Sequence, residues 1–409
     1  MPKTLFIGID ISSEENVAQF MDHEGASLRP SLQFRNSQAG LDQLVRAISD
    51  LVEEHDAEHL HVGMEATGLY WWHLRESLAA EPLLESLRVD VYVINPSLIK
   101  GFKKAYTTLP KTDAVDAWVI ADRLRFGRLK PVTENDLLYH PLARLTRFRL
   151  TMTQALTKDK NRACQLLFLK CSEYRKTAGR RTFGKASVAL FNEFTTEELA
   201  HKPLEELLEV ILANTNNRFA DPQGFANEIK RAARNSYRLS PKMQDSVGVA
   251  LAMTCENIRY FETQCKKLDK VIGRELEAIP QTLTTVPGIG NVLAAGIIAE
   301  VGDVTRFDHE KALAKFAGLT WHRHQSGRFE AEETSLTKAG NHYLRYYLVE
   351  AANSLRVHNP EYAAFYARKY DEVPKHQHKR ALVLTARKLV RLVYALLSTG
   401  QIYREGSKS

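Results

Sequence analysis

The first hundred residues alternate short apolar runs with longer stretches of helical spacing. Short apolar runs bounded by turn residues predict strands, and apolar residues three and four apart predict helices. The predicted strands lie at 4–12, 16–21, 32–34, 59–64 and 89–94, and the predicted helices at 41–52 and 69–80. Three antiparallel strands followed by parallel strands with helical crossovers predict a mixed α/β sheet with helices on both faces.

After residue 135 the pattern changes to long helices. Residues 141–175 and 241–278 keep helical spacing over many turns, and the segment between them carries no motif that we can interpret. Two long helices separated by an insertion predict a coiled-coil-like hairpin, suited to dimer formation or to gripping a duplex. We therefore predict three regions: the sheet domain at 1–135, a helical coiled-coil-like region at 136–280 with an insertion at about 184–239, and a mostly helical, all-α C-terminal domain at 281–409.

A turn with two glycines precedes an apolar helix that ends near residue 299. The sequence Val286-Pro287-Gly288-Ile289-Gly290 is typical of a helix-hairpin-helix, in which glycines let backbone N–H groups approach a phosphate. A plain helix start with proline in its first turn is the alternative. Further along, residues 319–333 are polar and predict a loop or hairpin that holds Ser326 and Gly327.

The chain of 409 residues carries a formal charge of +7, with a pI near 9.0, which suits a polyanionic partner. Between residues 144 and 185, Lys and Arg far outnumber the acids, whereas a solvated face usually mixes the signs. We expect this segment to follow a nucleic-acid backbone. The residues expected to contact nucleic acid are Lys103, Lys104, Lys111, Arg144, Arg147, Lys158, Arg162, Gly288, Gly290, Lys338 and Arg345.

No apolar run reaches the length of about 18 residues that a membrane span needs. The N-terminus leads directly into the first strand without a signal-peptide pattern. We therefore expect a cytoplasmic protein that does not contact a membrane.

Four acids occupy positions where a sheet and a helix could bring them together. Asp10 ends the first strand, Glu65 follows the fourth, and Asp113 and Asp116 lie three residues apart on one face of a helix that begins after Thr112. Acids at a helix start also complement the helix dipole, and a lone Asp after a strand can cap a turn. Repelling carboxylates at one sheet edge are better explained by a divalent cation, which binds such oxygens. Two Mg²⁺ ions could stabilise both oxygens of a phosphodiester displacement.

Motifs in both halves resemble those of the DEDD-motif insertion-sequence transposases. The N-terminal motifs, which resemble the family's RuvC-like domain, are Gly8-Ile9-Asp10, Met64-Glu65-Ala66-Thr67-Gly68, Ile94-Asn95-Pro96 and Lys111-Thr112-Asp113-Ala114-Val115-Asp116-Ala117. The C-terminal motifs, which resemble its transposase domain, are Val286-Pro287-Gly288-Ile289-Gly290, Phe316-Ala317-Gly318-Leu319-Thr320, Ser326-Gly327 and Lys338-Ala339-Gly340-Asn341 with Leu344-Arg345.

The resemblance implies an RNase H-like (RuvC-like) N-terminal fold and an enzyme that cuts and rejoins DNA. It implies that Asp10, Glu65, Asp113 and Asp116 bind Mg²⁺, and that Ser326 is the nucleophile that becomes joined to a DNA phosphate. It further implies a homo-oligomer, a dimer or tetramer, in which acids and serine form one composite site. Members of this family are similar to recombinases guided by a noncoding bridge RNA that pairs with target and donor DNA. The resemblance also implies a bacterial or archaeal protein that is associated with the nucleoid.

Other readings remain open at this point. A RuvC-like Holliday-junction nuclease would use the same acids with water as nucleophile, but it leaves Ser326 unused. A sugar-kinase or actin-like ATPase also begins with Gly-Ile-Asp after a strand, but it needs further glycine-rich phosphate loops that we do not find. A nucleic-acid-binding scaffold with inactive acids is the third alternative. Ser335 is a rival hydroxyl without a following glycine, and Thr337 stands where the family often has Ser.

Overall fold

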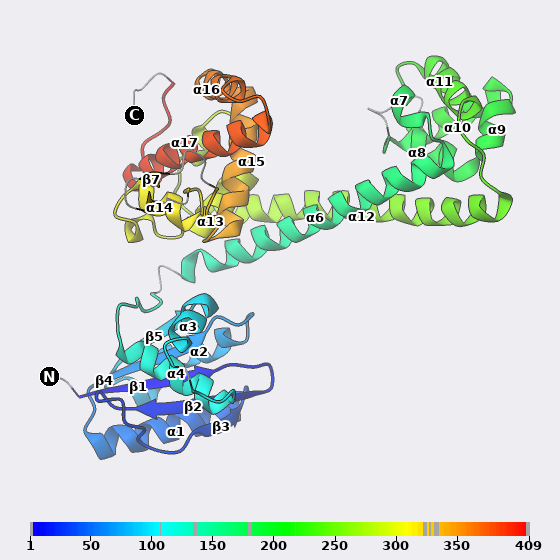
Figure 1. Ribbon diagram of the computed structural model, residues 1–409. Helices are drawn as coiled ribbons and strands as arrows, with labels where there is room; N and C mark the ends of the chain where they lie inside the picture. Colours follow the sequence, from blue (N-terminus) through cyan, green and yellow to red (C-terminus); the bar gives the residue numbers. More distant parts are fainter. Residues whose placement is uncertain are drawn as a thin grey trace. The chain divides into compact units, whose positions relative to one another are not determined.

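The computed structural model describes residues 3–106, 108–133, 137–178, 182–216, 218–321, 325–326, 329–330 and 335–405. Its internal contacts divide the chain into two compact units, Met1–Leu137 and Leu138–Ser409 (Figure 1). The predicted boundary at residue 280 falls inside the second unit and stays a prediction.

The first unit is built on a five-stranded sheet in the order β3-β2-β1-β4-β5. Its strands are β1 (Thr4–Asp10), β2 (Glu15–Met21), β3 (Leu32–Arg35), β4 (His59–Glu65) and β5 (Arg88–Ile94). The first three pair antiparallel, whereas β4 runs parallel to β1 and β5 parallel to β4. The five predicted strands are confirmed, and they form the mixed antiparallel and parallel sheet that the sequence pattern predicted.

Helices cover both faces of this sheet, as predicted (Figure 1). They are α1 (Gln38–His55), α2 (Trp71–Ala79), the 3₁₀ helix η1 (Pro82–Leu84), α3 (Pro96–Lys103) and α4 (Asp113–Arg125). Side chains alternate along a strand. Leu5, Ile7 and Ile9 of β1 therefore share one face and pack in a core with α1 and α2. The other face carries Gly8 and packs against α4.

Two glycines let α4 lie against the sheet. Gly8 of β1 and Gly63 of β4 are paired side by side in the parallel register. A Cβ atom at Gly8 would lie 2.1 Å from the Ala117 carbonyl oxygen, and one at Gly63 would lie 2.8 Å from a Leu124 methyl. Real Cβ atoms do not approach so closely, so only glycine permits this distance between helix and strands.

The second unit contains the two predicted long helices, which lie side by side (Figure 1). They are α6 (His140–Lys170) and α12 (Pro241–Glu277). The first ends five residues earlier than the predicted 175, because Cys171 leaves helical geometry at φ −149°. Its buried sulfur lies 3.3 Å from the Ser236 hydroxyl, which fixes the chain direction there.

The predicted insertion folds into helices with a core of their own. These are α8 (Lys185–Glu193), α9 (Thr196–His201), α10 (Leu204–Thr215) and α11 (Pro222–Arg234). The short helix α7 (Tyr174–Ala178), which precedes the predicted insertion, packs with them. Their buried residues, including Tyr174 and Phe225, pack with Leu167 of α6 and Leu251 of α12. The insertion is therefore a packed helical cluster on one end of the long helix pair.

A second core at the other end of the pair joins the C-terminal elements. These are η3 (Leu283–Thr285), α13 (Asn291–Val301), η4 (Val304–Arg306), α14 (Glu310–Phe316), α15 (His342–His358), α16 (Pro360–Asp371) and α17 (Gln377–Thr399). The two short strands β6 (Gln325–Ser326) and β7 (Phe329–Glu330) come between α14 and α15 in the sequence. The predicted helix-hairpin-helix is not confirmed, because the element before the glycine turn is a three-residue 3₁₀ helix. The mostly helical character of this region is confirmed.

The apolar stripe of α17 belongs to this core. Leu389, Val390 and Val393 are fully buried in it. Across the described ranges, none of the helices combines the length and the apolar character that crossing a membrane requires.

Candidate active site

The ends of two parallel strands hold the first two predicted acids. Ile9 of β1 is paired with Met64 of β4, so the next residues, Asp10 and Glu65, end neighbouring strands at the same sheet edge. Asp10 lies two residues after Gly8, and Glu65 lies two residues after Gly63. Because side chains alternate between the faces of a sheet, both acids lie on the face that α4 covers. Strand periodicity and register thus bring these two carboxylates together.

The first turn of α4 holds the other two acids. Thr112 caps this helix by accepting a hydrogen bond from the Val115 N–H at 3.3 Å, and Asp113 and Asp116 follow within the first turn. The next residue, Ala117, is the one whose carbonyl approaches Gly8. The glycine contact therefore fixes the acidic turn of α4 next to the strand that carries Asp10.

The electrostatics of Asp10 confirm that all four carboxylates are neighbours. Its pKa is raised from 3.8 to about 6, first by partial burial and then by the negative charges of Asp116, Asp113 and Glu65. Because the three neighbouring charges oppose ionisation of Asp10, the site favours a proton or a cation there.

Glu65 shows the same effect in a weaker form. Its pKa is raised by burial and by Asp116, against the lowering effects of a Thr67 hydrogen bond and of Lys103. The Lys103 ammonium, predicted to contact nucleic acid, is bonded to Asp116 Oδ1. One positive charge of the chain itself therefore partly balances the cluster.

The donor chemistry of this cluster fits a hard divalent cation, which prefers carboxylate oxygens. Over the described residues, no three His, Cys, Asp or Glu side chains are arranged closely enough to hold a metal ion as they stand. The four acids converge and repel one another, which a divalent charge would relieve, so their residue types and placement fit such an ion.

The predicted nucleophile lies in the second unit. Ser326 is the last residue of β6 and is paired with Phe329 of β7 in a two-stranded sheet, so the hairpin alternative for 319–333 is confirmed. Gly327 lies outside the described residues. At the hairpin base, Trp321 bridges Leu336, and the Thr337 N–H donates to the Thr320 carbonyl at 2.8 Å.

Arg345 holds the base of this hairpin. Its Nη1 donates to the carbonyls of Ala317 and Lys338 at 3.1 and 3.0 Å, one on each side of the hairpin. Gly318 and Gly340 both have positive φ, and a Cβ atom at Gly340 would lie 2.3 Å from the Phe316 carbonyl oxygen. Arg345 is therefore engaged with two backbone carbonyls and Lys338 is exposed, and the contact of both with nucleic acid stays a prediction.

An ion pair between half-exposed Arg147 and buried Glu300 connects α6 with this region. Arg147 donates to both oxygens of Glu300 at 2.7 and 2.8 Å, and Asn341, the cap of α15, donates to the same carboxylate at 2.6 Å. Arg147 also lies over the Tyr343 ring. Its charge is thus paired inside the unit, and its predicted contact with nucleic acid stays a prediction. Sequence reasoning missed Glu300, although a single acid in the apolar helix 291–301 signals a buried partner.

The remaining predicted contact residues differ in exposure. Lys104, Lys111, Lys158 and Arg162 are exposed, and Arg144 is half-buried with a pKa lowered by burial and by Arg147. Residues 179–181 of the predicted basic track lie outside the described residues.

The two glycines predicted to approach a phosphate have different surroundings. Gly290 begins α13 with open space around it, which leaves room for a phosphate. A Cβ atom at Gly288 would lie 3.3 Å from Ser354 and His358, so this glycine serves the packing of its turn against α15.

Comparisons with known proteins match both ends of the chain. Residues 7–170 match a family model of DEDD transposases of the IS110 type, described as a transposase, and residues 280–367 match a model described as the transposase IS116/IS110/IS902 family. The chain is 24% identical to the pilin gene-inverting protein of Moraxella lacunata over 97% of this chain and 96% of that protein. It is 27% identical to the transposase for insertion sequence element IS1111A of Coxiella burnetii, over 45% of this chain and 54% of that protein.

Among solved structures, the chain is similar to T. thermophilus RuvC in complex with a Holliday junction substrate. The identity is 16% and the TM-score 0.24, over 32% of this chain and 99% of that chain. The two family models describe one group of transposases and match in chain order. The chain therefore belongs to the IS110/IS116 family of insertion-sequence transposases and is a DNA transposase or recombinase.

Proposed function

We propose that this transposase cuts and rejoins DNA with the four acids of the first unit and the hydroxyl of Ser326. The observation that carries this proposal is the convergence of Asp10, Glu65, Asp113 and Asp116, seen in the raised pKa of Asp10. A purely structural acid cluster of this kind would destabilise the fold without compensation.

The acids are proposed to hold Mg²⁺. A bound divalent ion would neutralise the charge of a scissile phosphate and lower the pKa of an attacking hydroxyl. The chain's own contribution is to fix the four carboxylates on rigid elements, two on strand ends and two on one helix turn. Lys103 would have to release Asp116 when an ion binds, and its ammonium would then be available to a DNA phosphate.

Ser326 is proposed as the nucleophile. Its Oγ forms a bond to the phosphorus of the scissile phosphodiester, the bond to one sugar oxygen breaks, and that oxygen leaves with the proton given up by the serine. Attack by a sugar hydroxyl of another strand then releases the serine and restores the phosphodiester. The number of phosphodiester bonds is unchanged, so no external energy source is needed.

The partners are proposed to be target and donor DNA, a noncoding guide RNA and further copies of this chain. A relative over nearly the full length is named as a pilin gene-inverting protein. Inverting a DNA segment requires rejoining as well as cutting, which favours strand exchange over a RuvC-like nuclease that uses water.

The test is a Ser326→Ala variant, with Ser335→Ala as the matched control. Each protein is expressed with the DNA that flanks its gene, and recombination between plasmids and covalent protein–DNA adducts are measured. We expect Ser326→Ala to lose both signals while DNA binding is kept, and Ser335→Ala to retain both. A RuvC-like nuclease would keep cutting after Ser326→Ala, and that outcome would replace our proposal with this second candidate. RNA that copurifies with the protein, sequenced from the same preparation, tests the guide.

A further inference from the structure

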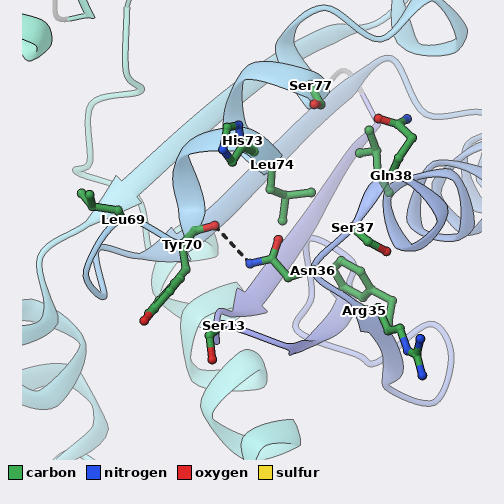
Figure 2. Close-up of a pocket in the computed structure, with 12 residues that line it drawn as sticks. Ser13, Arg35, Asn36, Ser37, Gln38, Leu69, Tyr70, His73, Leu74 and Ser77 are labelled. Carbon is green, nitrogen blue, oxygen red and sulfur yellow. Dashed lines mark hydrogen bonds between the residues drawn. The ribbon is translucent and has the colours of Figure 1, made fainter.

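A cavity of about 570 Å³ lies in the first unit, lined by residues other than the four acids (Figure 2). Three segments line it: the loop after β1, the junction between β3 and α1, and the loop after β4 with the start of α2. Its size falls within the range of small-molecule binding sites and is ample for one nucleotide.

Two of the three segments continue directly from the acids. Ser13 lines the cavity three residues after Asp10, and Leu69 and Tyr70 line it shortly after Glu65. Asn36 joins these two loops, since its Nδ2 donates to the Ser12 carbonyl at 2.9 Å. The same nitrogen donates to the Tyr70 carbonyl at 3.2 Å (Figure 2). A strand held at the acids would thus have the cavity as its neighbour at the same sheet edge.

The chemistry of the cavity suits a base with its phosphate. Leu69 and Tyr70 are large apolar side chains that remain 49% and 48% exposed. Arg35 and His73 supply polar and cationic groups, and none of the residues that line the cavity is an acid. The cavity thus lacks the negative charge that the four carboxylates carry. Aromatic rings beside cationic groups are the usual means of holding single-stranded nucleic acid.

Tyr70 is held in place by its backbone rather than by its ring. Its carbonyl accepts the Asn36 hydrogen bond, and a Cβ atom at Gly68 would lie 3.5 Å from Cε2 of the Tyr70 ring. Replacing the ring leaves this backbone hydrogen bond in place, which makes Tyr70 suitable for a test.

We propose that this cavity takes one unpaired nucleobase of the DNA strand that is bound at the acids, stacked on Tyr70 and Leu69. The proposal rests on the proposed function, because that function supplies the DNA strand. It adds a strand-positioning site that holds the nucleotide next to the scissile phosphate out of the duplex.

The test measures binding of the full chain to three fluorescent 12-mers in buffer with EDTA, so that cleavage plays no part. The probes are oligo(dA), the same backbone without bases, and oligo(rA). The variants are Tyr70→Ala, Tyr70→Phe and Leu69→Ala, with Leu83→Ala as the matched control, since Leu83 is 66% exposed in the same unit and does not line the cavity.

We expect Tyr70→Ala to weaken oligo(dA) binding by about 5- to 150-fold, the range for one stacked base. Tyr70→Phe should bind like the native chain, and Leu69→Ala should lose affinity in the same direction. The abasic probe should bind all variants equally. Leu83→Ala should change nothing.

An unchanged affinity of Tyr70→Ala for oligo(dA), or an equal loss on the abasic probe, would overturn the proposal. A larger loss on oligo(rA) than on oligo(dA) would overturn the assignment to DNA in favour of RNA. These outcomes are independent of the proposed function, which instead fails if Asp10→Asn still cleaves DNA.

Discussion

Replacement of Asp10 by Asn should stabilise the fold while it removes activity. In the native chain the pKa of Asp10 is about 6 when folded and 3.8 when unfolded. Between these values the folded state keeps a proton that the unfolded state has released. The free energy of unfolding therefore falls as the pH rises from about 4 to about 6. Above that range the stabilising contribution of the Asp10 proton is lost.

The pKa difference corresponds to about 3 kcal/mol. Asp10 is only half-buried, so solvent screening reduces this to about 1–2 kcal/mol. An Asn side chain has nearly the same shape and carries no charge. We expect Asp10→Asn to be more stable than the native chain by this amount at pH 8, by about a third of it at pH 4.5, and nearly equal to the native chain below pH 3.8, where Asp10 is protonated in both states.

The assay is urea unfolding in EDTA at several pH values, followed by tryptophan fluorescence. Trp71, Trp72 and Trp118, three of the four tryptophans, lie in the first unit, so the signal reports mainly on the domain with the acids. Asp50→Asn, an exposed acid on α1, is the control and should show no gain. Mg²⁺ at about 100 times its dissociation constant should stabilise the native chain by about 2.7 kcal/mol and the variant by less.

The reasoning is refuted if Asp10→Asn unfolds at the same or lower urea concentration than the native chain at pH 8. It is also refuted if native stability does not fall between pH 4.5 and pH 7. Either result would mean that the four carboxylates do not repel one another in the folded protein.

Two further predictions concern the helix that carries the acids and the basic track. Gly8→Ala should destabilise the first unit by at least about 1–3 kcal/mol, because its Cβ would overlap the Ala117 carbonyl. Gly101→Ala, with open space around it, should be nearly neutral. Urea unfolding measures both variants, and equal effects would contradict the packing argument. Lys158→Glu should weaken DNA binding and lower the slope of log affinity against log salt by about 0.9 per lost phosphate contact. Lys242→Glu, outside the predicted track, should leave the slope unchanged. An equal fall in both slopes would argue against a specific track.

Much of the first unit could be predicted because its signals are local. The apolar runs of β1 and β4 and the Thr112 cap of α4 each depend on neighbouring residues alone, and all three elements lie where the pattern predicted them. The helix α3 was not among the predicted elements, although Asn95 caps it and Pro96 begins it. Its eight residues offer too few positions for a clear apolar period.

The basic residues show what local signals leave out. Arg147 and Arg345 belong to basic or family motifs and were predicted to meet phosphate. In the fold they bond to Glu300 and to two hairpin carbonyls, partners that are distant along the chain. A sequence gives the charge of a side chain but not which group it meets.

By itself the sequence determined the strands and helices that carry Asp10, Glu65, Asp113 and Asp116, and the family to which the motifs point. Only the tertiary structure decided that these acids converge, through the pairing of Gly8 with Gly63 and the close approach of α4 that it allows. It also decided that a cavity opens beside them and that Arg147 and Arg345 are used internally. The physical reason is that periodicity and capping act over a few residues, whereas strand register, close packing and electrostatic repulsion depend on groups that only folding brings together.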